Sequence, residues 1–154
     1  MFTNMEYPLI GTVNLGLDSS KVHLQATKAF NLAYSHGRLG QIWAKILGRQ
    51  NHLQTLSFQP ASSHHMTNRI VAVPIRKIKG SLGRSEDFDL NFNPLHERCR
   101  SRWISVATAF QMNIPLPPVE LVQVGDAYYV QDGHHRISVA KNMEQEMIDA
   151  RIVN

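Results

Sequence analysis

The sequence Asp132-Gly133-His134-His135-Arg136 lies between an apolar run at 128–130 and a helical pattern over 137–143, and it is the most informative segment of the chain. The first amides of a helix have no partner within the helix, and the helix dipole favours negative charge beyond them. Gly133 permits a tight turn and a close approach of the backbone to a ligand. Arg136 can contact a phosphate through two N–H groups. The stretch therefore predicts a strand, a turn and a helix that hold an anion; the simpler alternative is a helix cap made by Asp132 and Gly133.

This turn resembles the signature of the ParB/sulfiredoxin superfamily, which reads Gly-Glu-Arg-Arg in partition proteins and Gly-Cys-His-Arg in sulfiredoxins. The runs 73–78 (Val-Pro-Ile-Arg-Lys-Ile) and 116–121 (Leu-Pro-Pro-Val-Glu-Leu) resemble the family's opening strand and the strand that enters the motif region. The chain is similar to stand-alone bacterial ParB-like proteins, which carry Arg-Asp-Phe-Asp where residues 84–89 read Arg-Ser-Glu-Asp-Phe-Asp. The resemblance implies an α/β (α+β) domain over residues 69–154, a small mixed sheet with packed helices. A helical extension and linker, residues 1–68, precede it.

The sequence differs from the family in two respects, and each difference removes one of the family's activities from what we expect of this chain. His134 stands where sulfiredoxins have their nucleophilic cysteine, and the single cysteine, Cys99, lies elsewhere, so we do not expect cysteine sulfinic reductase activity. Partition proteins follow this domain with a helix-turn-helix reader of DNA, whereas this sequence reaches Asn154 directly after its last strand pattern. Sequence-specific centromere binding is therefore not expected.

The resemblance also implies a ligand, because the Gly-x-x-Arg turn of the superfamily holds nucleotide phosphates or lies beside nucleic acid. The predicted phosphate-binding residues lie in the motif and in the loop over 79–85. They are Gly133, His134, His135, Arg136, Ser138, Ser81, Gly83 and Arg84. The loop has two glycines and two serines that can form a nest of amides, although an ordinary turn is the alternative. The expected ligand is a nucleotide such as ATP, ADP or CTP, with Mg²⁺ as a bridging cofactor.

His134 and His135 are the candidate proton-transfer groups, because histidine titrates near neutral pH. They lie about 100° apart on the predicted helix, so at most one of them is expected to face the anion. Asp132 either caps the helix or orients a histidine or Mg²⁺. Ser138 either reaches phosphate or bonds its own backbone. The resemblance implies that an enzyme built on this turn would be a nucleotide hydrolase, a phosphotransferase or a nuclease. Phosphoryl transfer needs mainly positioning and charge neutralisation.

Two other functions stay open at the level of sequence. Arg98 and Arg102, with a basic N-terminal segment, can follow a phosphate backbone as in a non-sequence-specific DNA-binding protein or nuclease, or they can simply form a solvated face. No motif that reads a groove accompanies them. The third alternative is a non-catalytic regulator of the same fold.

Composition excludes several classes of protein. The net charge is +4 over 154 residues and 43% of residues are hydrophobic, which fits a globular domain and permits phosphate ligands. No apolar run approaches the roughly 20 residues that span a bilayer, so we expect no membrane partner. One cysteine suits a reducing cytoplasm. His64 and His65 lack a third ligand nearby in the sequence, and we predict no metal site.

The remaining pattern predicts the order of elements. Helices are expected from about Ser20 and from Leu39 to Leu47, interrupted at Gly37 and Gly40, as an amphipathic hairpin. We expect this hairpin to pack on the domain as a helical layer; the alternative is an arm that docks a partner or nucleic acid, and its apolar face would suit a homodimer. A connector over 50–68 and a long helix over 95–112 follow. Strands are expected over 70–75, 119–124, 128–131 and 148–153, with a tight turn at Gly125-Asp126.

Overall fold

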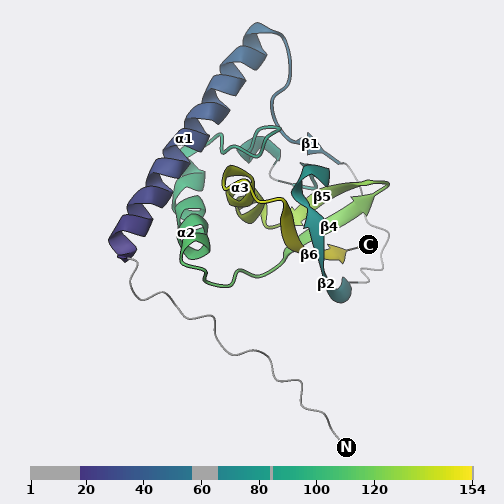
Figure 1. Ribbon diagram of the computed structural model, residues 1–154. Coiled ribbons are helices and arrows are strands. Elements are labelled where there is room, and N and C mark those ends of the chain that lie inside the picture. The colour runs from purple at the N-terminus through teal and green to yellow at the C-terminus, as the bar shows by residue number, and fades with distance from the viewer. Residues whose placement is uncertain (1–17, 57–65, 84, 154) are drawn as a thin grey trace, which may run out of the picture.

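The computed structural model describes residues 18–56, 66–83 and 85–153, which form an α+β fold (Figure 1). The α-helices are α1 (Ser19–Ile46), α2 (Arg100–Gln111) and α3 (His134–Asn142), and the short 3₁₀ turns are η1 (Ile75–Lys77), η2 (Ser85–Asp87) and η3 (Glu97–Cys99). The strands are β1 (Gln54–Thr55), β2 (Met66–Pro74), β3 (Ile78–Ser81), β4 (Val119–Val124), β5 (Ala127–Asp132) and β6 (Met147–Val153).

The strands of the described part form one mixed sheet in the order β1-β3-β5-β4-β6-β2. β4 and β5 form an antiparallel hairpin, whereas β5 runs parallel to β3 and β4 runs parallel to β6. The helices stack outward from the sheet, with α3 nearest to it, α2 next and α1 outermost (Figure 1). The predicted fold class, a small mixed sheet with packed helices, is confirmed.

The predicted helical hairpin near the N-terminus is wrong, because residues Ser19–Ile46 form one continuous helix. Gly37 lies inside this helix and is buried. A Cβ at Gly37 would lie 2.7 Å from the carbonyl oxygen of Pro94, so glycine allows the segment before η3 to approach the helix backbone. The glycine that suggests a break in the sequence is therefore a packing residue, at a cost in helix propensity of about 1 kcal/mol.

Helix α1 shares its core with the segment after residue 69. The aromatic ring of Phe30 packs edge-on against Trp103, with centroids 5.7 Å apart. Leu53, in the predicted connector, is fully buried in the same cluster. The division into residues 1–68 and 69–154 stays a prediction, but α1 and Leu53 share one hydrophobic core with the described residues after 69.

Several elements also differ from the predicted ones in their bounds or their type. The long helix begins at Arg100 rather than Leu95, because residues before it form a β-bridge between Phe88 and Pro94 and then η3. Strand β3 occupies the first part of the predicted loop 79–85. β1 lies in the predicted connector and pairs with β3. The histidines at 64 and 65 lie outside the described residues.

The strand–turn–helix motif is confirmed as an element order. The β4–β5 hairpin turns at Gly125, which has φ +60°, and β5 runs directly into α3 through Gly133. In the part of the chain that the structure describes, no helix is both long and apolar enough to cross a membrane.

Candidate functional site

A pocket of about 690 Å³ lies at the N-terminal end of α3. Three segments line it: η3 with α2, the extended segment before β4, and the motif turn. The lining residues are Arg98, Ser101, Arg102, Ser105, Val106, Leu116, Pro117 and Asp132 to Arg136. This volume lies within the range of about 300–1,000 Å³ that small-molecule sites occupy.

Gly133 sets the geometry of the motif turn. Its φ is +102°, in the left-handed region, and a Cβ there would lie 2.5 Å from Cγ1 of Val119. Both the backbone conformation and the contact with β4 therefore require glycine. Gly133 is also the N-cap residue of α3, and no side chain caps it. Of the two roles considered for Asp132, the helix cap is not observed, and the positive end of the helix dipole faces the pocket.

Arg136 lines the pocket, but its guanidinium is held by the protein. It donates to the carbonyl oxygens of Pro117 at 2.5 Å and Pro118 at 2.9 Å, and to Oδ2 of Asp132 at 2.5 Å. The Arg136 side chain is only 12% exposed, against 64% for Asp132. Arg136 thus joins the first turn of α3 to the segment that enters β4, and it shapes the pocket wall.

His134 is anchored to β3. Its Nε2 lies 2.6 Å from Oγ of Ser81 and 3.1 Å from the carbonyl oxygen of Gly83. Its ring stacks on Phe88, and the ring of His135 meets Phe88 edge-on. The two histidines are 5% and 8% exposed. The structure therefore brings Ser81, Gly83 and His134 together, with Ser81 fully buried behind the turn rather than in the pocket wall.

Ser138, a predicted phosphate contact, lies outside the pocket wall. The Ser138 hydroxyl is fully buried, donates to the carbonyl oxygen of Phe92 at 2.5 Å and accepts from Nε1 of Trp103 at 2.8 Å. It does not line the pocket, and it connects α3 to α2 and to the loop before η3. The residue at 84 lies outside the described residues.

Arg98 and Arg102, predicted as nucleic-acid contacts, line the same pocket as the motif turn. Arg98 pairs with Asp87 at 2.5 Å. The hydrogen bond and negative charge of Asp87 raise the pKa of the Arg98 guanidinium. Arg102 is exposed, and among the described residues nothing forms a hydrogen bond or ion pair with it. Arg102 is therefore the cation of the pocket wall that is available to a ligand.

Sequence reasoning missed Ser101 and Ser105, whose side chains share this wall. Together with Arg98 and Arg102 they follow the spacing i, i+3, i+4, i+7, which places them on one side of a helix. The signal that could have found them is a polar stripe opposite the apolar stripe of the same helix.

The pocket and α1 lie on opposite sides of α2. Arg100 lies over the ring of Phe30, 4.6 Å from its centroid, and bonds Asn31 of α1. Arg102 follows two residues later, about 200° around the helix, and lines the pocket. The basic residues of α1 are thus separated from the pocket by the width of α2.

No group of three or more histidine, cysteine, aspartate or glutamate side chains that could hold a metal ion occurs among residues 18–56, 66–83 and 85–153. The pocket wall has one carboxylate, Asp132, which pairs with Arg136. Any cation there would need most of its ligands from water or from a bound phosphate.

No protein-family model matches the chain, and no curated protein matches it. Among solved structures, the chain is similar to the crystal structure of sulfiredoxin from Arabidopsis thaliana, with 21% sequence identity and a TM-score of 0.40. The similarity covers 55% of this chain and 83% of that chain. The function therefore has to be argued from the pocket itself.

Proposed function

We propose that this protein binds a nucleotide in the pocket between α2 and α3. The observation that carries the proposal is the convergence of two sources of positive potential on one cavity. The N-terminal end of α3 supplies a helix dipole without a side-chain cap, and Arg98 and Arg102 line the same pocket. Phosphate groups bind well where backbone amides and guanidinium groups meet.

The rest of the pocket wall suits a sugar and a base. The hydroxyls of Ser101 and Ser105 lie one helical turn apart on the wall formed by α2, where they can bond the hydroxyls of a ribose. Val106, Leu116 and Pro117 supply the apolar part of the lining. The pocket thus combines a basic part and an apolar part within a volume that a mononucleotide can fill.

Mg²⁺ would enter this site together with the phosphates. Magnesium keeps several waters and is commonly bound through one or two carboxylates plus substrate phosphates. Asp132 is the carboxylate in the wall, and its side chain is 64% exposed. ATP, ADP and CTP with Mg²⁺ are therefore the first ligands to test.

The proposal extends to catalysis if the protein also turns the nucleotide over, by hydrolysis or by phosphoryl transfer. His134 and His135 line the pocket, and histidine is the side chain that most often transfers protons in enzymes. The hydrogen bonds of His134 with Ser81 and Gly83 fix its ring, which suits a group that must keep its position while phosphate charge shifts.

Nucleic acid is the competing ligand, and the arrangement of α2 favours a single nucleotide over it. A polynucleotide that used both the pocket and the basic residues of α1 would have to pass around α2. The test is a titration of Mg²⁺ with ATP, ADP and CTP, set beside a titration of a DNA oligonucleotide at low and high salt. Saturable nucleotide binding with a shallow salt dependence supports the proposal. Oligonucleotide binding alone, lost steeply with salt, would replace it, and no binding of either would leave a regulator of the same fold.

A further inference from the structure

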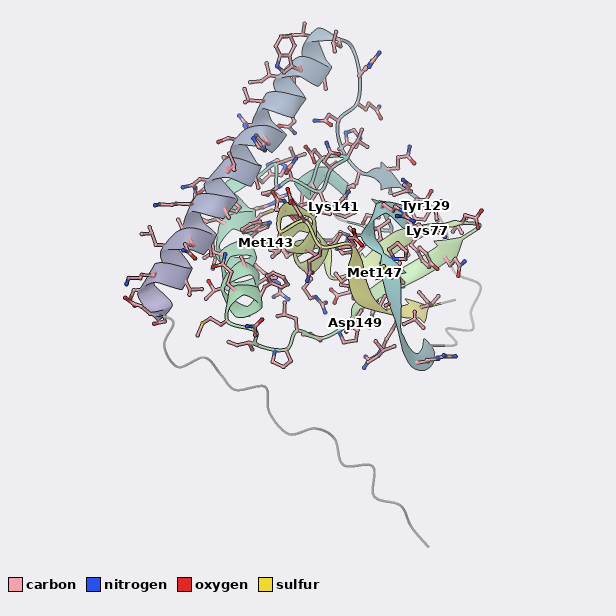
Figure 2. All side chains as sticks on the ribbon, in the orientation of Figure 1. Lys77, Tyr129, Lys141, Met143, Met147 and Asp149 are labelled. Carbon is pink, nitrogen blue, oxygen red and sulfur yellow. The ribbon has the colours of Figure 1, made fainter. Side chains whose placement is uncertain are left out.

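A stripe of large apolar side chains runs along the solvent side of α1. It consists of Leu32, Leu39, Ile42, Trp43 and Ile46, which are 53–67% exposed. Side chains project outward from this helix along its length, and its C-terminal end extends past the rest of the molecule (Figures 1 and 2). Single exposed apolar residues are ordinary, whereas a contiguous set on one helix marks an interaction surface.

This stripe does not belong to the core of the domain. The buried residues of α1 are Val22, Ala26, Phe30, Ala33 and Gly37, and they face α2. At 100° per residue, the centre of the exposed stripe lies roughly 140° away from the centre of that buried face. The helix therefore has two apolar sides, of which the domain uses one.

The spacing of the stripe is that of a coiled-coil seam. Leu32, Leu39 and Ile46 repeat at intervals of seven, and Ile42 lies three residues after Leu39. These are the a and d positions of two heptads, the pattern with which one helix packs lengthwise against another. We propose that the stripe is occupied by α1 of a second copy of this chain, in a parallel pair about a two-fold axis.

Charge explains the parallel orientation. The segment 19–46 contains Lys21, Lys28, Arg38 and Lys45 and no acidic residue. In the assigned register Arg38 and Lys45 occupy g positions, and Trp43 occupies an e position. In an antiparallel pair g positions meet g positions, so Arg38 would face Lys45 of the partner subunit. In a parallel pair g meets e, and Arg38 lies beside Trp43 of the partner subunit, a favourable cation–π contact.

The size of the seam predicts a reversible dimer. Stable interfaces bury about 800 Å² on each partner, and this seam offers two heptads in which one d position is the small, polar Ser35. The dimer should therefore form with rising protein concentration. The nucleotide pocket lies on the opposite side of α2, so dimerisation does not depend on the proposed function.

The test is sedimentation velocity of the full chain from low to high micromolar concentration, with tryptophan emission as a second readout. Trp43 is 62% exposed and Trp103 is buried, so pairing should shift emission to shorter wavelength through Trp43 alone. Ile42→Lys should abolish the dimer. The matched control is Ile114→Lys, at a residue 48% exposed outside α1, which should leave the dimer intact.

Leu39→Glu provides a second variant of the seam, and circular dichroism checks that both variants keep their helices. A wild type that stays monomeric throughout, or an Ile42→Lys variant that dimerises like wild type, would overturn the proposal. Arg38→Glu tests the orientation. It should weaken a parallel dimer by roughly fivefold or more through loss of the contact with Trp43, whereas a tighter dimer would show that the helices pair in the antiparallel sense.

Discussion

The guanidinium of Arg136 donates to the carbonyl oxygen of Pro118 over 2.9 Å, which ties the first turn of α3 to the segment before β4. Together with its hydrogen bonds to Pro117 and Asp132, this contact holds the wall of the pocket in place. Arg102, which lines the same pocket, has no such bonds among the described residues. Substitution of Arg136 should therefore lower the stability of the fold, whereas substitution of Arg102 should weaken ligand binding.

Arg136→Ala should lower the free energy of unfolding by about 2–3 kcal/mol, because charge-assisted hydrogen bonds of this kind contribute about 1.5–3 kcal/mol. Arg102→Ala, at an exposed position, should stay within about 0.5 kcal/mol of wild type. Urea unfolding measures both. Equal stability of the two variants would show that the bonds of Arg136 contribute nothing to the fold.

Gly133→Ala should destabilise the protein by about 2–5 kcal/mol, the sum of two costs. A side chain in the left-handed region costs about 1–2 kcal/mol, and the contact with Val119 at 2.5 Å adds strain of about 1–3 kcal/mol. Gly83→Ala is the matched control, because a Cβ at Gly83 meets nothing within 4 Å. Thermal or urea unfolding that ranks the two variants equally would contradict the assigned role of Gly133.

Ser138→Ala should cost about 1–3 kcal/mol, since it leaves the buried Nε1–H of Trp103 without its acceptor. The near-ultraviolet circular dichroism of the tryptophans should change as well. Ser105→Ala, the same substitution at an exposed residue of α2, should change stability by less than about 0.5 kcal/mol. A Ser138→Ala variant that unfolds like wild type would show that the Trp103 indole finds another partner.

The pH dependence of stability should carry a contribution from Lys141 on α3 (Figure 2). Burial lowers the pKa of its amine from the ordinary value of 10.5; Asp89 opposes this shift and Lys79 adds to it. Between the lowered pKa and 10.5, the unfolded chain binds more protons than the folded one, so the free energy of unfolding rises with pH in that window. Below this pH window Lys141 is protonated in both the folded and the unfolded chain, and the free energy of unfolding is lowered by the full cost of burying the charged amine.

Lys141→Gln should remove this rise, whereas Lys45→Gln, at an exposed residue of α1, should retain it. Urea unfolding at a series of alkaline pH values measures the slope. An unchanged slope in Lys141→Gln would assign the pH dependence to another group.

The hairpin and motif helix could be predicted from sequence because their signals are local. Alternating apolar residues in 119–124, the Gly125 turn and the Gly133 turn each specify their own backbone. The role of Gly37 could not be predicted from sequence, because it depends on a contact with Pro94, which is far away in the chain. The same holds for Ser138, whose hydroxyl is engaged by Trp103 and Phe92.

The candidate site was only partly visible for a similar reason. In the sequence, the motif turn indicates one part of the pocket, whereas Arg98 and Arg102, which line another part, indicate a separate nucleic-acid surface. Their position in the same pocket as the motif turn follows from the packing of α2 on α3, which no local pattern specifies. Arg136 resembles a ligand contact in the sequence because two of its three acceptors are the backbone carbonyls of Pro117 and Pro118, which leave no signature in side chains.

Binding of nucleotide phosphates in the pocket is best measured by calorimetric titration of Mg²⁺-ATP, Mg²⁺-ADP and Mg²⁺-CTP into wild type, Arg102→Ala and Arg76→Ala. Arg76 is exposed in η1 and does not line the pocket. We expect wild type and Arg76→Ala to bind at least one nucleotide with equal affinity, and Arg102→Ala to bind it about 10- to 100-fold more weakly, as loss of a charge-assisted bond predicts. No binding by wild type, or equal binding by all three proteins, would contradict the account.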